Sequence, residues 1–526
     1  MKRQFHRRVA GMAAMLLAAT GLVACSGGGE SVDVGGGSGE TDSDSPDADG
    51  TPGGTLRAAI AGEPDQLDPN STTAYFSFQV LENVFDTLIQ PDANLEMQPA
   101  LAESWDVSED QLTWTFNLRE DVTWHDGSDF TSADVAYTYN RIIDEQLSSS
   151  WRFSAIEDIA TPDDLTVEIT VSSPSPNLLA NIGGYKGVAI VQEENVESGE
   201  IATHPIGTGP FVFESWSSGQ GISLSANADY WDGAPQIDGV DFQFVSEPST
   251  AVAALQSGEA DWTDNVPPQQ VESLAGNDTV ELGQVGSNDY WYLALNQGNE
   301  PFDILEVRQA IAYALDRDGI TDAAMFGNAT VNQTAIPANS AWYTEFDEFS
   351  YDDARASELL DDAGVDPADI PMEIMVATDY PETVTAAQII LDQLSDIGIE
   401  GSITQYDFGT WLDNQGEGNF DMLMMGWLGN IDPDDFYYSQ HHTDGGNNYQ
   451  GYSNARVDEL LDQGRTETDD AARKAIYDEV ATLVASEASY IYLYNPDVIQ
   501  AWSPSVQGYE VLADRAIRFK DVTLAD

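Results

Sequence analysis

The sequence predicts a mixed α/β fold, because strand-like and helix-like segments alternate along residues 53–526. Two segments show the period-two alternation of a half-buried strand: LTWTFNLRE at residues 112–120 and LTVEITV at residues 165–171. The run YIYLY at residues 490–494 has the continuous apolar character of a buried strand. Strand signals dominate before Pro301, and helix signals dominate after it.

Helices are therefore expected mainly in the second half of the chain. Asp303 and Glu306 have the spacing of a capping box, so we expect a helix to begin there. Apolar residues recur with helical spacing at residues 457–461 and 476–484, which predicts two further helices. The length of residues 53–526 is typical of two or three domains, although no repeat or second low-complexity linker divides them.

The N-terminus is typical of an exported lipoprotein. Residues 1–8 are basic and residues 9–24 are apolar, as in a secretory signal peptide. The sequence LVAC at residues 22–25 resembles a bacterial lipobox, in which Cys25 would carry the lipid and become the new N-terminus. Cys25 is the only cysteine, so no intramolecular disulfide is possible. The alternative is that Cys25 is a buried cysteine in a signal peptide that is not cleaved. The arginines at residues 7–8 are also compatible with the twin-arginine export route, but the sequence fits the Sec route better.

Residues 25–53 are predicted to be a disordered acidic tether. They consist mainly of Gly, Ser, Asp and Glu, with almost nothing to bury, and such a segment cannot offset its ordering entropy. As a flexible coil it would reach about 30 Å on average. The aspartates at residues 42–49 have a faint likeness to a calcium loop, but Pro46 interrupts the spacing, and we expect no calcium site there.

The charge balance is strongly acidic, with 91 Asp and Glu against 19 Lys and Arg and a net charge of −72. Self-repulsion of this size disfavours compaction, and salt screens it, so we infer a saline habitat as a hypothesis. No basic patch is available to neutralise phosphates, which excludes nucleic acid as an expected partner.

The sequence offers no catalytic residue, cofactor site or metal site. GTGPF at residues 207–211 lacks the lysine of a phosphate-binding loop, and no Gly-x-Ser-x-Gly elbow is present. His441 and His442 lie in a turn-like stretch without a further ligand at metal-binding spacing, so we expect a solvated loop. Carboxylate pairs are too frequent to indicate catalysis, and we expect a protein that is not an enzyme.

Aromatic residues give the better indication of a site. The chain has 12 Trp, 21 Tyr and 19 Phe, concentrated at residues 72–80, 288–296, 406–412 and 424–439. Most should fill the core. Trp427, however, precedes a polar turn at residues 429–433, and rings beside a turn with polar groups are typical of a ligand pocket.

Over residues 53–520 the chain resembles the extracellular solute-binding proteins of family five, the oligopeptide, dipeptide and nickel binding subunits of ABC importers. Six stretches carry the resemblance, in the order and spacing of that family. They are LAESWDVSEDQLTWTFNLREDVTWHDGSDFTSADVAYTYNRI (101–142), PIGTGPFVFESW (205–216), NADYWDGAPQIDGVDFQFV (227–245), ALQSGEAD (254–261), FDILEVRQAIAYALDRDGI (302–320) and GYSNARVDELL (451–461).

The resemblance implies a two-lobed periplasmic-binding-protein-like fold of type II, in its large three-subdomain variant, with hinge strands and a ligand cleft between the lobes. Closure on the ligand would be a population shift. The implied parts are lobe one at 54–290 with a subdomain at about 91–204, lobe two at 291–494, a C-terminal return to lobe one at 495–526, and hinge strands near 290–296 and 494–499.

The resemblance is less informative about the ligand. Peptide-binding relatives have an aspartate three residues before the Asp/Glu-Pro turn, and it pairs with the peptide amine; here that place holds Gly429, and Asp432 or Asp434 would have to substitute. The only cation between Asp318 and Ala455 is Arg355, which leaves no arginine there for a peptide carboxylate. A long peptide held through its backbone, a sugar, or another neutral or cationic solute all stay open, whereas nickel is not expected.

We therefore expect a monomeric, lipid-anchored receptor on the outer face of the cell membrane, or on its periplasmic side in a Gram-negative host. It would capture a small solute, for which an oligopeptide is the favoured interpretation, and deliver it to ABC transporter permease subunits. The lipid anchor would be its sole contact with the membrane. The alternatives are a signal-peptide sensor with the same fold and, from another class, a secreted hydrolase. The expected ligand-binding residues are Tyr75, Phe76, Trp291, Trp411, Trp427, Asn430 and Asp432.

Overall fold

The computed structural model describes residues 53–184, 186–378, 380–428 and 431–525. The predicted signal peptide, Cys25 and most of the predicted tether lie outside these residues, as do Gly429 and the expected ligand-binding residue Asn430.

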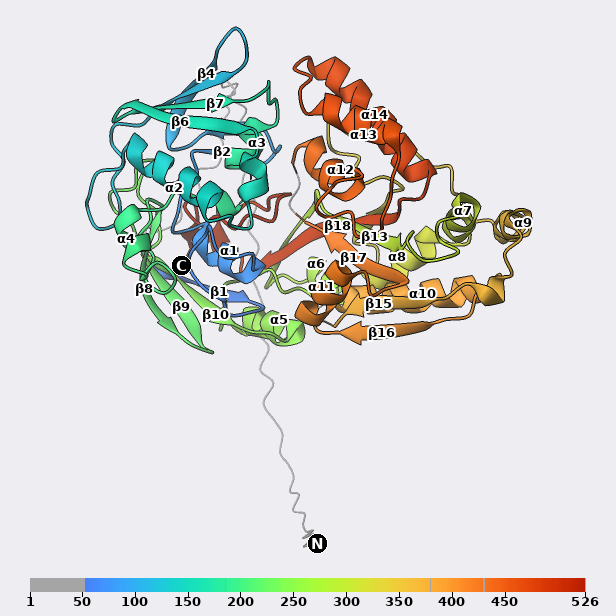
Figure 1. Ribbon diagram of the computed structural model, residues 1–526. Helices are drawn as coiled ribbons and strands as arrows, with labels where there is room; N and C mark the ends of the chain where they lie inside the picture. Colours follow the sequence, from blue (N-terminus) through green and yellow to red (C-terminus); the bar gives the residue numbers. More distant parts are fainter. Residues whose placement is uncertain (1–52, 185, 379, 429–430, 526) are drawn as a thin grey trace, which may run out of the picture. The chain divides into compact units, whose positions relative to one another are not determined.

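One large sheet runs through the folded chain (Figure 1). Its strand order is β16-β15-β17-β13-β18-β11-β1-β10-β9-β8, and β12 and β14 also pair with β18. The strands are β1 Thr55–Ile60, β8 Phe211–Ser217, β9 Gly221–Ala226, β10 Gly239–Phe244, β11 Trp262–Thr263, β12 Glu281–Gly286, β13 Tyr290–Leu295, β14 Ala329–Val331, β15 Glu373–Ala377, β16 Ser402–Tyr406, β17 Met422–Trp427 and β18 Tyr490–Trp502.

Strand β18 joins the two parts of this sheet. Its residues 490–496 pair with β13 and β14, and its residues 497–502 pair with β11 and β12. The predicted strand YIYLY is thus confirmed, and it continues well beyond the apolar run. Because one uninterrupted strand belongs to both parts, a change in its twist would move them relative to each other.

A separate four-stranded antiparallel sheet has the order β4-β5-β7-β6. Its strands are β4 Ala102–Val107, β5 Thr113–Leu118, β6 Ile156–Asp163 and β7 Thr166–Val171, so both strands predicted from alternation are confirmed. Phe116, Leu118, Val167 and Ile169 are buried in one core with Val135 of the helix that packs on the sheet. Two shorter ribbons pair β2 Ile89–Pro91 with β3 Met97–Pro99, and β19 Val506–Gln507 with β20 Thr523–Leu524.

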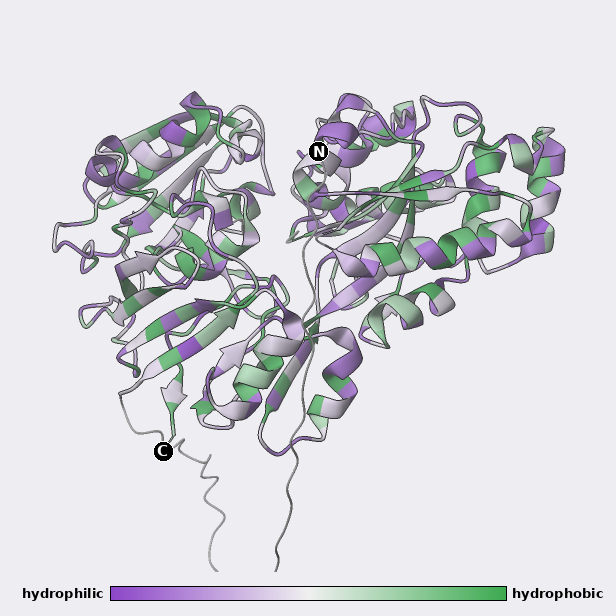
Figure 2. Cartoon of the chain, turned by 90° about the horizontal axis from the view of Figure 1, so that it is seen from below, coloured by the Kyte–Doolittle hydropathy of each residue, from purple (hydrophilic) through white to green (hydrophobic). Residues whose placement is uncertain are grey.

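The helices cover the sheets, and Figure 2 shows hydrophilic and hydrophobic residues alternating along them, as expected for amphipathic helices. Their bounds are α1 Tyr75–Leu81, α2 Ser132–Asp144, α3 Leu178–Gly183, α4 Glu193–Glu197, α5 Pro248–Ser257, α6 Val271–Ala275, α7 Leu305–Tyr313, α8 Arg317–Met325, α9 Asp353–Ala363, α10 Pro381–Asp396, α11 Phe408–Glu417, α12 Pro433–His441, α13 Ala455–Gly464 and α14 Asp470–Ser486.

Strand β13 lies between two hydrophobic cores and is buried along its whole length. Trp291 and Leu293 face the core formed with α7, α8, α9 and α10, whereas Tyr290 and Tyr292 face the core formed with α11, α12, α13 and α14. Successive residues of a strand point to opposite faces, so this part of the chain is a helix–sheet–helix sandwich. The prediction of a mixed α/β fold is confirmed.

The helix predicted after Pro301 is present as α7, but its predicted capping box is wrong. The helix begins one residue later, with Ile304 at the N-cap and no side-chain cap. Arg308 Nη1 donates to the carbonyls of Phe302 and Asp303 at 3.0 and 3.2 Å, and these bonds hold the preceding turn instead. The helices predicted at residues 457–461 and 476–484 are confirmed as α13 and α14.

The prediction that both adjacent histidines lie in a solvated loop is wrong for His441. It is the last residue of α12 and is fully buried, with Nδ1 2.8 Å from Ser489 Oγ and Nε2 2.9 Å from Tyr492 Oη. Burial lowers the pKa of His441 to about 3, so the ring is neutral at physiological pH. The helix that buries it begins at Pro433, a favourable first helical residue, immediately after the polar turn.

Candidate ligand-binding site

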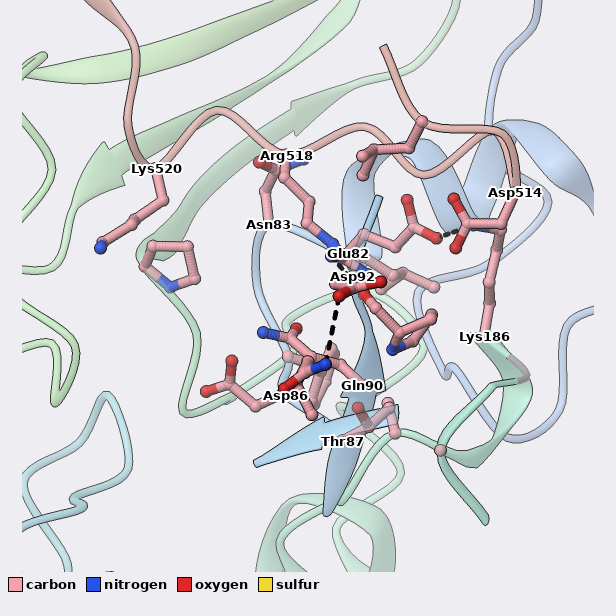
Figure 3. Close-up of a pocket in the computed structure, with 18 of the residues that line it drawn as sticks. Glu82, Asn83, Asp86, Thr87, Gln90, Asp92, Lys186, Asp514, Arg518 and Lys520 are labelled. Atoms are coloured by element: carbon pink, nitrogen blue, oxygen red, sulfur yellow. Dashed lines mark hydrogen bonds and ion pairs between the residues drawn. The ribbon is translucent and has the colours of Figure 1, made fainter. Parts of the chain in front are cut away.

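One cavity of about 380 Å³ is lined mainly by charged and polar groups from the segment after α1, from β2 and from the C-terminal segment (Figure 3). These groups bind one another. Lys186 pairs with Glu82, and Lys520 pairs with Asp232 at 2.8 Å. The Arg518 guanidinium donates to the carbonyl of Pro91 at 3.1 Å.

Asp86, one of the buried carboxylates of this cavity, is also fully occupied. Asp86 accepts hydrogen bonds from Thr208 at 2.9 Å and from Tyr230 and Trp231 at 3.0 Å each. Among the described residues that line the cavity, no buried side-chain polar atom lacks a partner. Such a satisfied network joins the segments that contribute to it and leaves little for a solute to bind.

A second cavity of about 180 Å³ has the opposite character, because aromatic and apolar side chains line it. It brings together Trp291, Trp411 and Trp427, three of the residues expected from the sequence to bind ligand. We call it the aromatic cavity; its other lining residues are Tyr292, Tyr380, Phe408, Leu412, Gln415, Met425, Gly426 and Leu428.

Strand pairing places Trp291 and Trp427 on neighbouring strands but on opposite faces of the sheet. Strands β13 and β17 are antiparallel, with Trp291 opposite Gly426 and Tyr290 opposite Trp427. A Cβ atom at residue 426 would come within 2.4 Å of the Trp291 ring, so the indole lies against the glycine backbone. On α11, Trp411 stacks on Phe408 with centroids 6.1 Å apart and is almost completely buried.

One residue that lines the aromatic cavity has a buried polar atom without a partner among the described residues. Trp291 is only 4 % exposed, and its Nε1–H has no acceptor among the described residues. By contrast, Trp411 Nε1 donates to the Met375 carbonyl at 3.4 Å. A buried donor without an acceptor costs about 1–3 kcal/mol, and a solute that supplies the acceptor would recover that free energy.

The structure places Asp432 outside the aromatic cavity, at the N-cap of α12. Its two carboxylate oxygens accept from Arg473 at 2.6 and 2.8 Å, and both side chains are nearly inaccessible. Asp434, the suggested substitute, pairs with Arg465 at 3.2 Å and accepts from Asn177 at 3.1 Å. Both carboxylates are therefore already bound within the chain.

Tyr75 and Phe76 also lie apart from the aromatic cavity, at the start of α1. The Phe76 ring packs against Gly62, where a Cβ atom would come within 2.4 Å of it. The Tyr75 hydroxyl donates to Asp264 Oδ2 at 3.3 Å, and this carboxylate was not singled out from the sequence. Nothing local marks it, because 189 positions separate the two residues.

The comparisons with known proteins agree with this architecture. The family model described as "Bacterial extracellular solute-binding proteins, family 5 Middle" matches residues 96–449. The chain belongs to this family. It is therefore an extracellular-type solute-binding protein with the two-lobed type II arrangement, and the resemblance stated from the sequence is confirmed.

Several relatives of this solute-binding protein have named ligands. It is 28% identical over 482 residues to the glutathione-binding protein GsiB of Escherichia coli O1:K1, covering 89% of this chain and 94% of GsiB. The binding protein DppA of Helicobacter pylori, solved with the peptide STSA, is 27% identical with a TM-score of 0.81, covering 90% of this chain and 99% of DppA. AgaA of A. tumefaciens R10, solved with agropinic acid, is 28% identical with a TM-score of 0.79, covering 90% of this chain and 99% of AgaA.

Within the described residues, no helix of this solute-binding protein is both long and apolar enough to cross a membrane. No group of three or more His, Cys, Asp or Glu side chains in the same residues is arranged to hold a metal ion.

Proposed function

We propose that this protein captures a small solute and delivers it to the permease of an ABC importer. The favoured solute is an oligopeptide. The observation that carries the proposal is the aromatic cavity with its unpartnered Trp291 N–H, located where β13 and β17 meet beside the strand shared by both parts of the sheet. Flat apolar walls with one fixed donor suit a peptide side chain next to a backbone carbonyl.

The relatives support a peptide-like ligand. Glutathione is itself a modified tripeptide, and DppA was solved with a tetrapeptide. AgaA binds agropinic acid, so the same fold also accommodates other small solutes, and a sugar or a neutral or cationic solute is the second candidate. Aromatic walls would bind a sugar ring equally well.

The attachment to the membrane is part of the proposal. Cys25 would carry the lipid, residues 25–53 would form the tether, and the protein would work as a monomer on the outer face of the membrane, or the periplasmic side in a Gram-negative host. Lobe one would comprise residues 54–290 and 495–526, and lobe two residues 291–494. A sensor without a permease would share all of these features and differ in that its deletion leaves uptake unchanged.

Mass spectrometry of the solute released on denaturation tests the ligand directly. The protein is purified in high salt and denatured, and the released small molecules are identified. We expect peptides, and a single sugar or amine species would overturn the peptide assignment. Turnover of captured peptides would indicate the hydrolase instead.

A pair of tryptophan variants then tests the cavity. Trp427→Ala should abolish capture without unfolding the protein, because Trp427 forms one wall of the aromatic cavity. The matched control is Trp216→Ala on β8, whose indole donates to Glu63 at 2.9 Å and which lies at the far end of the large sheet. Equal capture by both variants would remove Trp427 from the binding site.

A further inference from the structure

A group of polar side chains from distant segments meets beside the shared strand β18. We call it the Asp264 cluster, and it comprises Tyr75, Gln79, Asp264, Asp289, Glu382 and Arg515. Its members come from α1, the residue after β11, the residue before β13, the first turn of α10 and the C-terminal segment. None of them lines either cavity described above.

Two acceptor atoms of this cluster have no donor in the part of the chain that the structure describes. Gln79 Nε2 donates to Asp264 Oδ2, which also accepts from the Tyr75 hydroxyl at 3.3 Å. Asp264 Oδ1 and Gln79 Oε1 are buried and have no partner among the described residues, and Gln79 is only 1 % exposed. The bond from Nε2 fixes which end of the Gln79 amide is the oxygen, so both unpaired atoms are acceptors, and they belong to two side chains that are bonded to each other.

The Asp264 cluster also has more negative than positive groups. Three carboxylates, those of Asp264, Asp289 and Glu382, lie near one guanidinium, that of Arg515. Arg515 Nε is already bound to Asp289 Oδ2 at 2.5 Å, and Asp289 is fully buried. Arg515 has a φ of 60°, a left-handed conformation that is uncommon for a residue other than glycine.

The pKa values of the other two carboxylates, Asp264 and Glu382, are both raised, which agrees with a shortage of positive charge near them. Burial raises the pKa of Asp264 to about 6, against the opposing effects of the Tyr75 hydrogen bond and the Arg515 charge. Burial likewise raises the pKa of Glu382, which Arg515 again opposes. At pH 7 the Asp264 carboxylate is nevertheless charged, because its pKa lies below that pH.

We propose that Asp264 and Gln79 bind a protonated amine of the captured solute. An ammonium group supplies the N–H donors that both unpaired oxygens lack and the positive charge that the cluster lacks. A carboxylate of the solute would be repelled by the same groups. Two free oxygens are also too few for a hard metal cation, which takes six or more ligands.

The position of the cluster fits a solute that also enters the aromatic cavity. Asp289 precedes Trp291 by two residues, which is about 7 Å along a strand. Glu382 follows Tyr380, which lines the aromatic cavity, by two residues. A peptide could thus place its amino terminus at the Asp264 cluster and a side chain in the aromatic cavity, and in this respect the inference rests on the proposed function.

A mixed peptide pool provides the test. A casein digest is divided, one half is acetylated at its amines, and the recombined pool is offered to the protein in high salt. For each lysine-free sequence, mass spectrometry then gives the ratio of free-amine to acetylated form among the captured peptides. We expect at least about a tenfold enrichment of the free amine, which corresponds to 1.4 kcal/mol.

Asp264→Asn should bring this ratio close to one, because it removes the charge and keeps the shape. The matched control is Asp241→Asn on β10, which makes the same charge change at a carboxylate bound to Ser223 and should keep the enrichment. The ratio compares two forms captured by the same folded molecules, so partial unfolding of a variant does not alter it.

The outcomes separate the two proposals. Equal capture of both forms by the unsubstituted protein would overturn the amine site and leave peptide capture standing. Retained enrichment in Asp264→Asn would overturn the role of that carboxylate. Capture of no peptide at all would overturn the proposed peptide function and, with it, the amine site. The unsubstituted protein decides the main question even if Asp264→Asn does not fold.

Discussion

Replacing Asp432 by asparagine should destabilise the fold and leave solute capture by the folded molecules intact. In the structure Asp432 caps α12 and accepts two hydrogen bonds from Arg473, at 2.6 and 2.8 Å. Arg473 itself also donates to the Gly464 carbonyl at 2.8 Å. The substitution keeps the size of the side chain and removes the charge that Arg473 faces.

The magnitude follows from the burial of the pair. The side chains of Arg473 and Asp432 are 3 % and 9 % exposed, so water cannot replace the lost partner. Removing one member of a buried ion pair leaves an uncompensated charge and typically costs about 3–5 kcal/mol. The bond from the Arg473 guanidinium to the Gly464 carbonyl would persist, so we expect the lower part of that range.

Urea denaturation followed by tryptophan fluorescence gives the change in the free energy of unfolding. The salt concentration is kept high and constant, because the net charge of −72 makes the stability depend on screening. The matched control is Glu459→Gln, which breaks an exposed ion pair with Arg456 and should leave the denaturation midpoint unchanged.

Solute capture by the Asp432→Asn variant decides between the two roles of this residue. Loss of capture together with a change in stability below about 1 kcal/mol would refute the structural role. It would restore the expectation from the sequence that Asp432 contacts the solute.

Three further results are expected. The folded-state pKa of His441, about 3, lies below its ordinary value, so the unfolded state binds more protons and the free energy of unfolding should fall as the pH drops from 6.5. The expected loss of stability by pH 5 is about 2 kcal/mol. Urea titrations of the two proteins in parallel should show that a His441→Gln variant does not have this pH-dependent loss. Gly426→Ala should push the Trp291 ring out of place, cost about 1–3 kcal/mol and abolish capture, and normal capture would show that the aromatic cavity is not the binding site. Arg152→Met should leave buried Asp435 without its 3.1 Å partner and speed hydrogen exchange in α12, with α9 as the unaffected control; unchanged exchange would mean that this contact does not hold the helix.

The aromatic part of the candidate site could be proposed from the sequence. Trp291, Trp411 and Trp427 stand in aromatic-rich segments, and the strand and helix patterns around them are local signals. Their convergence could not be proposed in that way, because it depends on the antiparallel register that sets Trp291 opposite Gly426. The sequence also gave no sign that the Trp291 N–H would lack an acceptor.

The acidic residues show the opposite case. In a chain with 91 Asp and Glu, a carboxylate that will be buried has the same local surroundings as one that stays in water. Asp432 was expected at the ligand, whereas folding brings it to Arg473, 41 positions away. No local pattern in the sequence predicted a role for Asp264, because folding brings it to Gln79, which lies 185 positions away.

The sequence by itself thus determined the alternating strands, the main helices, the expectation of a lipid anchor at Cys25 and the family, because periodicity and motif spacing are properties of neighbouring residues. Only the tertiary structure decided which carboxylates are paired, that His441 is buried and that two oxygens of the Asp264 cluster lack donors. Pairing and burial depend on contacts between distant segments. In a chain with so many carboxylates and so few cations, the packing of the chain determines which carboxylate each cation contacts.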